Sequence, residues 1–155
     1  MIEPQFGNLI GTVFREGLSA VAYPNGKFGY IDKLGILVIP MQFDQALIFS
    51  EGLAAVSIKE KWGYIDKAGK FVIEPQFRSA GSFSEGLAPV GSEPSAMRTE
   101  QTGAGTGYID KTGKMAIKLG FDGASSFVDG IAKVFVESRI GYIDKKGNYI
   151  WKPTR

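Results

Sequence analysis

The chain has 155 residues, of which 44% are hydrophobic and 22% charged, a composition typical of a folded globular domain rather than a disordered segment. The net charge is only +2, which argues against binding to nucleic acid or to an acidic membrane through a general electrostatic field. Cysteine and histidine are both absent, which excludes disulfides, thiolate metal sites and any chemistry that needs an imidazole.

The start of the chain and its hydropathy pattern contain no targeting signal. Residues 1–6 lack the basic region and apolar run of a signal peptide. No window approaches the roughly 18 apolar residues that a membrane-spanning helix requires, so we expect no membrane insertion. The expected location is therefore the cytoplasm.

One pentad, Gly-Tyr-Ile-Asp-Lys, occurs four times and divides the chain into repeats. Its copies begin 34, 44 and 34 residues apart, at Gly29, Gly63, Gly107 and Gly141. A second marker, an acidic residue followed by glycine and an apolar residue, begins at Glu16, Glu51, Glu85 and Asp129. Self-similarity at such a period is the signature of a tandem repeat fold.

Phenylalanine follows the same period. One phenylalanine stands two residues before each acidic marker, at Phe14, Phe49, Phe83 and Phe127. Another recurs earlier in the unit, at Phe6, Phe43, Phe77 and Phe121. These positions hold eight of the eleven phenylalanines, which indicates a core that is built once and then repeated.

We predict a single repeat domain over residues 1–155. Its units are 29–62, 63–106 and 107–140, and two half-units, 1–28 and 141–155, together complete a fourth. Residues 2–6 match residues 73–77, so the first half-unit begins at about the point in the repeat where the last one ends. Complementary half-units are expected in a closed ring, and equally in a piece of a longer array.

Each unit is predicted to form a three-stranded β-meander. In the fullest copy the strand candidates are 53–58, 62–65 and 70–73, all short and rich in β-branched and aromatic residues. No segment keeps a helical period of apolar residues over three turns, so we expect an all-β protein. Units of about 34 residues are short for a four-stranded propeller blade, which favours a solenoid-like array over a small closed, propeller-like ring.

The turn between the second and third strands is predicted from its residues. In the segment 66–69, Asp66 suits the first position of a type I turn, where its carboxylate can accept the N–H two residues on. Gly69 supplies the left-handed residue that closes the hairpin. The same pattern recurs at 32–35, 110–113 and 144–147.

The regular spacing is broken once, by about ten extra residues within the segment 91–106. This segment is rich in Gly, Ser, Thr and Glu and poor in apolar residues, so we expect a surface loop between two strands. It is either a tolerated insertion at a hairpin tip or a specificity loop.

The repeated polar residues have structural explanations that compete with functional ones. The turn aspartates at 32, 66, 110 and 144 could supply the carboxylate pair of a glycosidase, but each already has a role in its turn. The acidic residues of the second marker are interpreted as acceptors in their turns. The turn lysines are expected to be solvated, and the tyrosines to lie in the core with their hydroxyl groups bonded at its edge. We predict no catalytic, cofactor-binding or metal-binding residues.

Residues that depart from the repeat are better candidates for a partner surface. The aromatic ones exceed their counterparts in size or fall outside the shared positions, although Trp151 could equally cap the last strands. Variable strand positions such as Ala55 and Pro89, together with the insertion, complete the expected surface. The predicted contact residues are Trp62, Arg98, Lys133, Tyr149 and Trp151.

Residues 62–77, together with 85–87, resemble the WG-type repeat family, and the resemblance extends over the whole chain. The tryptophan of the family pattern is present only at Trp62, and its counterparts are Phe28, Thr106 and Ile140. The resemblance implies a mostly bacterial, all-β tandem repeat that mediates interactions and shares no catalytic residues. We therefore expect a non-enzymatic scaffold for protein–protein interaction, with carbohydrate or cell-envelope binding as the alternative and a carboxylate-pair enzyme as a third hypothesis.

Overall fold

The computed structural model describes residues 13–92 and 105–153, and all regular structure within them is β-strand. The prediction of an all-β tandem array is therefore confirmed. Within these residues there is no helix that could cross a membrane. The contacts divide the chain into two compact units, Met1–Pro75 and Gln76–Arg155.

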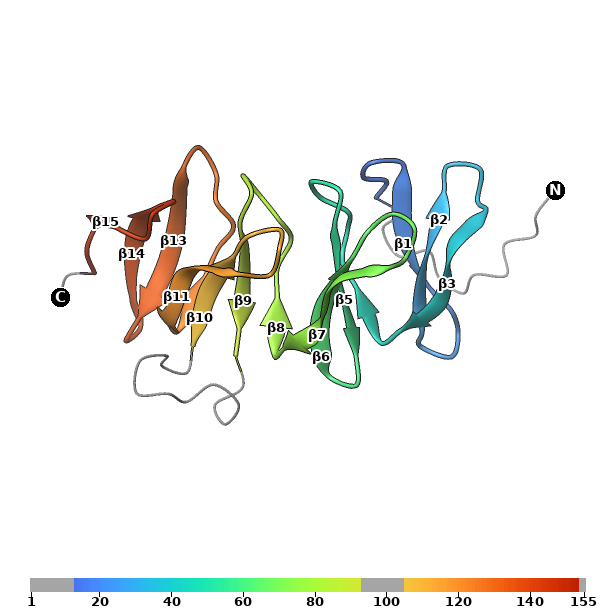
Figure 1. The fold of residues 1–155 in the computed structure, drawn as a ribbon, viewed down its shortest axis with the longest axis horizontal. Coiled ribbons are helices and arrows are strands. Elements are labelled where there is room, and N and C mark those ends of the chain that lie inside the picture. The colour runs from blue at the N-terminus through green and yellow to red at the C-terminus, as the bar shows by residue number, and fades with distance from the viewer. Residues whose placement is uncertain (1–12, 93–104, 154–155) are drawn as a thin grey trace. The chain divides into compact units, whose positions relative to one another are not determined.

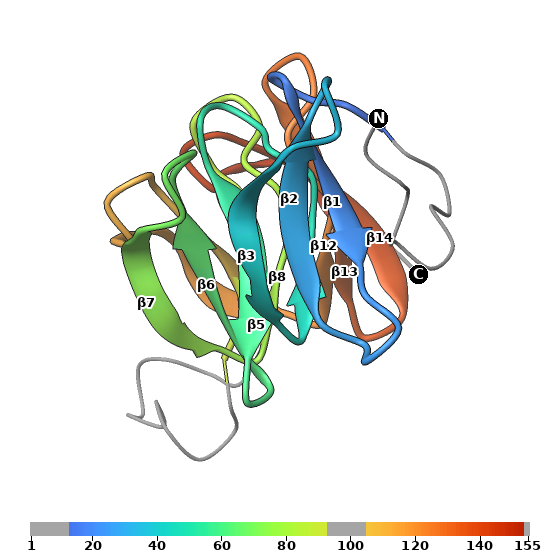
Figure 2. The ribbon, with the colours of Figure 1, turned by 90° about the vertical axis from the view of Figure 1, so that its right-hand side faces the viewer.

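The first unit contains two antiparallel sheets, in each of which the strands lie side by side in chain order (Figure 1). The first sheet, seen face on in Figure 2, consists of β1 (Leu18–Ala22), β2 (Phe28–Asp32) and β3 (Leu37–Phe43). The second consists of β4 (Gln45–Ala46), β5 (Ala54–Ile58), β6 (Lys61–Ile65) and β7 (Phe71–Phe77).

The second unit repeats this arrangement with two four-stranded sheets. One consists of β8 (Ser79–Ala80), β9 (Ala88–Gly91), β10 (Thr106–Ile109) and β11 (Met115–Phe121). The other consists of β12 (Gly123–Ala124), β13 (Ile131–Val136), β14 (Arg139–Asp144) and β15 (Tyr149–Trp151). The three strands predicted for each repeat are present in every sheet. Three of the sheets also contain a fourth strand of two residues, which the sequence did not indicate.

The third strand of the repeat runs four residues beyond its predicted end because it bulges past a glycine. In the first sheet Phe28 pairs with Phe43 but Tyr30 pairs with Ile39, so β3 carries extra residues opposite Gly29. A Cβ on Gly29 would lie 2.5 Å from the Ile39 carbonyl oxygen, which leaves no room for any other residue. This close approach explains why the pentad begins with glycine.

The turn predicted at Asp66 is confirmed. Oδ1 of Asp66 accepts hydrogen bonds from the N–H groups of Ala68 at 2.9 Å and Lys70 at 3.0 Å. Gly69 has a φ of 81°, in the left-handed region that glycine adopts without strain. Equivalent bonds to Oδ1 are present at Asp32, Asp110 and Asp144.

The acidic-Gly markers form tight turns of a different kind. Glu16 and Gly17 have φ values of 53° and 86°, and Arg15 and Leu18 exchange both backbone hydrogen bonds, as in a type I′ turn. The Glu16 carboxylate accepts the N–H of Gly52, in the equivalent turn of the next repeat, at 3.0 Å. The predicted acceptor role is thus present, but it links two repeats instead of closing one turn.

The recurring tyrosines and phenylalanines form the contact between successive sheets. The ring of Tyr30 lies 4.9 Å from that of Phe49, and its hydroxyl group donates to the Leu47 carbonyl at 2.7 Å. In the second unit the ring of Tyr108 lies 4.8 Å from that of Phe127, and its hydroxyl group donates to the Ser125 carbonyl at 2.6 Å. The predicted core role of the tyrosines is confirmed at these positions.

Candidate functional site

The residue that follows the recurring phenylalanine has a structural role in two of the sheets. Asp44 follows β3, and its Oδ2 accepts the N–H of Lys59 at 2.8 Å. Asp122 follows β11, and its Oδ2 accepts the N–H of Glu137 at 2.6 Å. Lys59 and Glu137 each begin a two-residue hairpin turn with positive φ, so each aspartate supports one such turn.

Arg78 replaces this aspartate in the sheet β8–β11. It follows β7, at the position that Asp44 and Asp122 occupy in the other repeats. The hairpin turn that an aspartate would support is replaced by the inserted segment between β9 and β10. This repeat therefore lacks both the aspartate and the hairpin turn that it supports. An exposed guanidinium occupies the position of the carboxylate.

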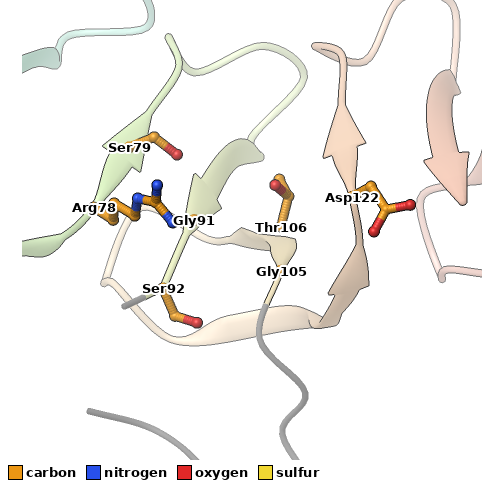
Figure 3. A pocket seen from close by; sticks show the side chains of 7 residues that line it. All are labelled: Arg78, Ser79, Gly91, Ser92, Gly105, Thr106 and Asp122. Atoms are coloured by element: carbon orange, nitrogen blue, oxygen red, sulfur yellow. The ribbon is translucent and has the colours of Figure 1, made fainter. Parts of the chain in front are cut away.

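Arg78 lines a pocket of about 380 Å³ at the base of the insertion (Figure 3). Backbone hydrogen bonds join the residues that line it: the Arg78 N–H donates to the Gly91 carbonyl at 2.9 Å, and the Ser92 N–H donates to the Gly105 carbonyl at 3.2 Å. In Figure 3 the Arg78 side chain extends towards Gly91, and the Asp122 carboxylate points away from Arg78. The lining residues are Arg78, Ser79, Gly91, Ser92, Gly105, Thr106 and Asp122.

A second pocket, of about 280 Å³, shares Ser79 and Thr106 with the first and is otherwise bordered by small residues and Pro89. Together the two pockets offer a guanidinium and several hydroxyl groups, while the Asp122 carboxylate is already bonded to the Glu137 N–H. Such a set can bind a polar group by hydrogen bonds, and a guanidinium favours a carboxylate or phosphate bound through two parallel bonds. It contains no nucleophile with an adjacent base. No group of three acidic residues suited to a metal ion occurs in the described part of the chain.

The carboxylates with shifted acidity are those engaged in turns. The Lys27 ammonium, through its side-chain hydrogen bond, lowers the pKa of Asp44, and the Lys59 N–H adds to this effect. The Thr112 hydroxyl group, 2.6 Å away, lowers the pKa of Asp110. The N–H of Asn148 lowers the pKa of Asp144. All of these carboxylates are held in the charged form, whereas a catalytic acid needs a raised pKa.

Three predicted contact residues lie on the last sheet. Lys133, on β13, holds its ammonium 5.7 Å from the centroid of the Phe135 ring. Tyr149, on β15, meets Phe121 edge-on at 6.5 Å. Trp151 stacks on Tyr142 with the rings 5.9 Å apart and 16° from parallel. The pairings place Lys133 and Trp151 on either side of Tyr142, in one row across the strands.

The other predicted residues lie on other elements or outside the described residues. Trp62 is half-buried on β6, in the first unit, where it pairs with Ser57. Arg98 lies outside the described residues. Ala55 is buried and faces Tyr64 across the strands, so the prediction that this position offers a binding surface is wrong. Pro89 is buried opposite Tyr108 but borders the second pocket.

Arg78 and Ser79 were not singled out from the sequence, whereas Thr106 lies in the segment 91–106 that was expected to contribute to the surface. The signal was present in the sequence, since Arg78 is the one basic residue at a position held by Gly7, Asp44 and Asp122 in the other copies. Its link to the insertion was not visible, because the two segments are separated by β8 and β9 and meet only in the folded sheet.

Comparison with known proteins identifies the repeat. A family model described as "WG containing repeat" matches residues 28–62, 62–91 and 107–138, which is more than half of the chain. No curated protein sequence matches the chain.

Solved structures share the fold at low sequence identity. The computationally designed Ika8 protein is 11% identical, with a TM-score of 0.57 over 89% of this chain and 46% of that chain. BamB from Moraxella catarrhalis is 12% identical, with a TM-score of 0.57 over 90% of this chain and 50% of that chain. The chain therefore spans about half the length of the structures it resembles.

Proposed function

We propose that this chain, which belongs to the WG containing repeat family, acts as a non-enzymatic repeat scaffold that binds a protein partner. The observation that carries the proposal is that Arg78 stands at the position that Asp44 and Asp122 occupy in other repeats, and that it lines the larger pocket. A repeat scaffold can vary such a position without disturbing its core, because each sheet packs only on its neighbours.

The chemistry of the pocket favours a polar segment of a partner protein. Arg78 is exposed and can bind an acidic side chain through two parallel hydrogen bonds. Ser79 and Thr106 can donate to or accept from the partner backbone beside it. Arginine is also among the residues that most often dominate the energy of an interface. We therefore expect the partner to present a carboxylate to Arg78.

The test compares two arginines of the second unit. Arg78 lines the pocket, whereas Arg139 is exposed on β14 and does not. The immobilised chain is used to retrieve a partner from a lysate of the source cells, and that partner is identified and purified. Its affinity is then measured for the wild type, for Arg78→Glu and for Arg139→Glu. We expect Arg78→Glu to weaken binding at least about tenfold and Arg139→Glu to leave it unchanged. Equal binding by both variants, or specific binding of a small molecule without any protein partner, would contradict the proposal.

One observation favours the carbohydrate alternative. Trp151 is 56% exposed and stacks on Tyr142, and an exposed pair of parallel rings is a surface on which sugar faces can pack. Retention of the chain on a polysaccharide column that is lost in Trp151→Ala and kept in Trp62→Ala would support this function. A chain that passes through a panel of polysaccharide columns without retardation removes it.

A further inference from the structure

Both units contain the same aromatic contact between one sheet and the next. In the first unit the tyrosine of the pentad, Tyr30, contacts Phe49, which lies nineteen residues further along the chain. In the second unit Tyr108 contacts Phe127 at the same separation. In both cases the tyrosine hydroxyl group donates to the carbonyl two residues before that phenylalanine. The contact is thus a fixed interface with one half on each of two successive repeats.

Two residues, Tyr142 and Phe14, stand at the positions of this contact but lack the partner ring in the described part of the chain. Tyr142 is half-buried, while its counterparts Tyr30 and Tyr108 are fully buried. Among the described residues its hydroxyl group makes no hydrogen bond to a carbonyl. Phe14 is 36% exposed, whereas Phe49 is 1% exposed at the equivalent position. Tyr142 is therefore a tyrosine half without a phenylalanine, and Phe14 a phenylalanine half without a tyrosine.

A second contact between repeats, in which a turn glycine covers an isoleucine of the preceding repeat, also lacks one partner at each end of the described chain. Ile39 is covered by the turn glycine of the following repeat, since a Cβ on Gly69 would lie 3.1 Å from its Cγ2. Gly147 covers Ile117 in the same way, at 3.2 Å. Trp151 occupies the position of these isoleucines, nine residues after the pentad tyrosine, and it is uncovered.

Gly35 is the turn glycine equivalent to Gly69 and Gly147, but it covers no side chain among the described residues. A Cβ there would meet nothing within 4 Å. Most of the exposed large apolar side chains belong to the first and the last described segments. Of the large hydrophobic residues that are exposed in the described ranges, all but Ile48 and Val72 lie in residues 13–38 or 128–151. Open apolar faces of this kind mark interaction surfaces.

We propose that these two surfaces bind each other between two copies of this chain, head to tail. Phe14 of one copy packs on Tyr142 of the other, and the Gly35 turn covers Trp151. The acidic contact between repeats extends in the same way, because Asp129 takes the place that Glu85 has opposite Gly130 and would face the N–H of Gly17 in the second copy. A second copy is the favoured occupant because this chain itself supplies both halves of each repeated contact.

A head-to-tail interface joins two different surfaces, so copies can add one after another into a closed ring or an open chain. We therefore expect sedimentation velocity to show a mass that rises with protein concentration. Phe14→Lys removes one surface and Trp151→Lys removes the other, and each variant alone is expected to remain a monomer. Val72→Lys, at an exposed position outside both surfaces, should associate like the wild type.

The decisive measurement is a mixture of Phe14→Lys and Trp151→Lys. The intact end of each variant fits the intact end of the other, so the mixture should form a dimer and nothing larger. An interface that uses the same surface on both copies cannot produce this rescue. Circular dichroism and thermal melting check that the variants fold, which the exposure of both side chains favours.

Cross-linking gives a second readout that does not depend on lysine being tolerated. The chain has no cysteine, so Phe14→Cys and Tyr142→Cys each introduce a single thiol, at two positions that face each other in the proposed interface. Mixed together they should form disulfide-linked dimers faster than either variant alone. The proposal is overturned if the wild type stays monomeric at every concentration, if the lysine mixture does not form dimers, or if Trp151 is engaged by a polysaccharide while the chain remains monomeric. It is independent of the proposed function, which is tested at Arg78.

Discussion

The carboxylate of Glu85 accepts a hydrogen bond from the N–H of Gly130, with both carboxylate oxygens 3.1 Å from the nitrogen. The residues are 45 positions apart and belong to equivalent turns of two repeats. Glu85 itself has a φ of 53°, a left-handed conformation that costs a residue with a side chain roughly 1 kcal/mol or more. The contact with the next repeat offsets this cost, which explains an acidic residue where glycine or asparagine would fit more easily.

This contact should contribute measurably to stability. We expect Glu85→Ala to lower the free energy of unfolding by about 1 kcal/mol, because the bond to the Gly130 N–H is lost. Asp129→Ala is the matched control, since Asp129 has nearly the same φ, 52°, and is exposed. Urea titration followed by fluorescence measures both variants. Equal losses in the two variants would assign the effect to the turn conformation and not to the contact between repeats.

The buried tyrosine hydroxyl groups provide a second comparison. Tyr108→Phe leaves the Ser125 carbonyl without its 2.6 Å donor, so we expect a loss of roughly 1–2 kcal/mol in the free energy of unfolding. Tyr142→Phe should cost much less, because the Tyr142 hydroxyl group donates to no carbonyl among the described residues. Thermal unfolding at low protein concentration compares the two. A loss at Tyr142 as large as that at Tyr108 would contradict this assignment.

The glycine that begins the pentad should tolerate no side chain. A Cβ on Gly63 would lie 2.5 Å from the Ile73 carbonyl oxygen and 2.7 Å from the Pro75 nitrogen, both of them backbone atoms. We expect Gly63→Ala to destabilise the fold by about 3 kcal/mol, since β7 would have to move away. Gly120→Ala is the control, because a Cβ there has nothing within 4 Å. Melting temperatures that fall equally in both variants would refute the role of the bulge.

Stability should fall at alkaline pH. Burial raises the pKa of Tyr30, Tyr64 and Tyr108 in the folded chain. A raised folded pKa gives stability that is complete below the unfolded pKa of about 10 and is lost as pH rises above it, because only the unfolded chain then releases the proton. The expected slope is about 1.4 kcal/mol per pH unit for each tyrosine involved.

Phenolate absorbance measured alongside unfolding checks this expectation. The buried tyrosines Tyr30, Tyr64 and Tyr108 should ionise together with the loss of β-structure. In Tyr108→Phe the free energy of unfolding should fall less steeply with pH, by about 1.4 kcal/mol per pH unit. Ionisation of all tyrosines before any loss of structure would show that their burial does not protect them.

The sequence by itself determined the repeat and everything local to it. Asp66 and Gly69 identify their turn because both act within four residues, and the position of the carboxylate relative to the backbone follows from the turn type alone. The short strands and the core role of the tyrosines followed from the same periodicity. The candidate site was only partly accessible. The departure from the repeat singled out Lys133, Tyr149 and Trp151 but not Arg78, and Ala55, which was assigned to the surface, is buried.

Only the tertiary structure decided what each repeated residue contacts across repeats. Glu16 reaches Gly52 and Tyr30 reaches Leu47 through packing of one sheet on the next, which no local pattern specifies. The same holds for the pocket, whose walls come from strands that meet only by pairing. Alternation within a strand gives the face on which a side chain lies, but burial depends on whether another sheet covers that face. That is why equivalent tyrosines are buried at Tyr108 and half-exposed at Tyr142.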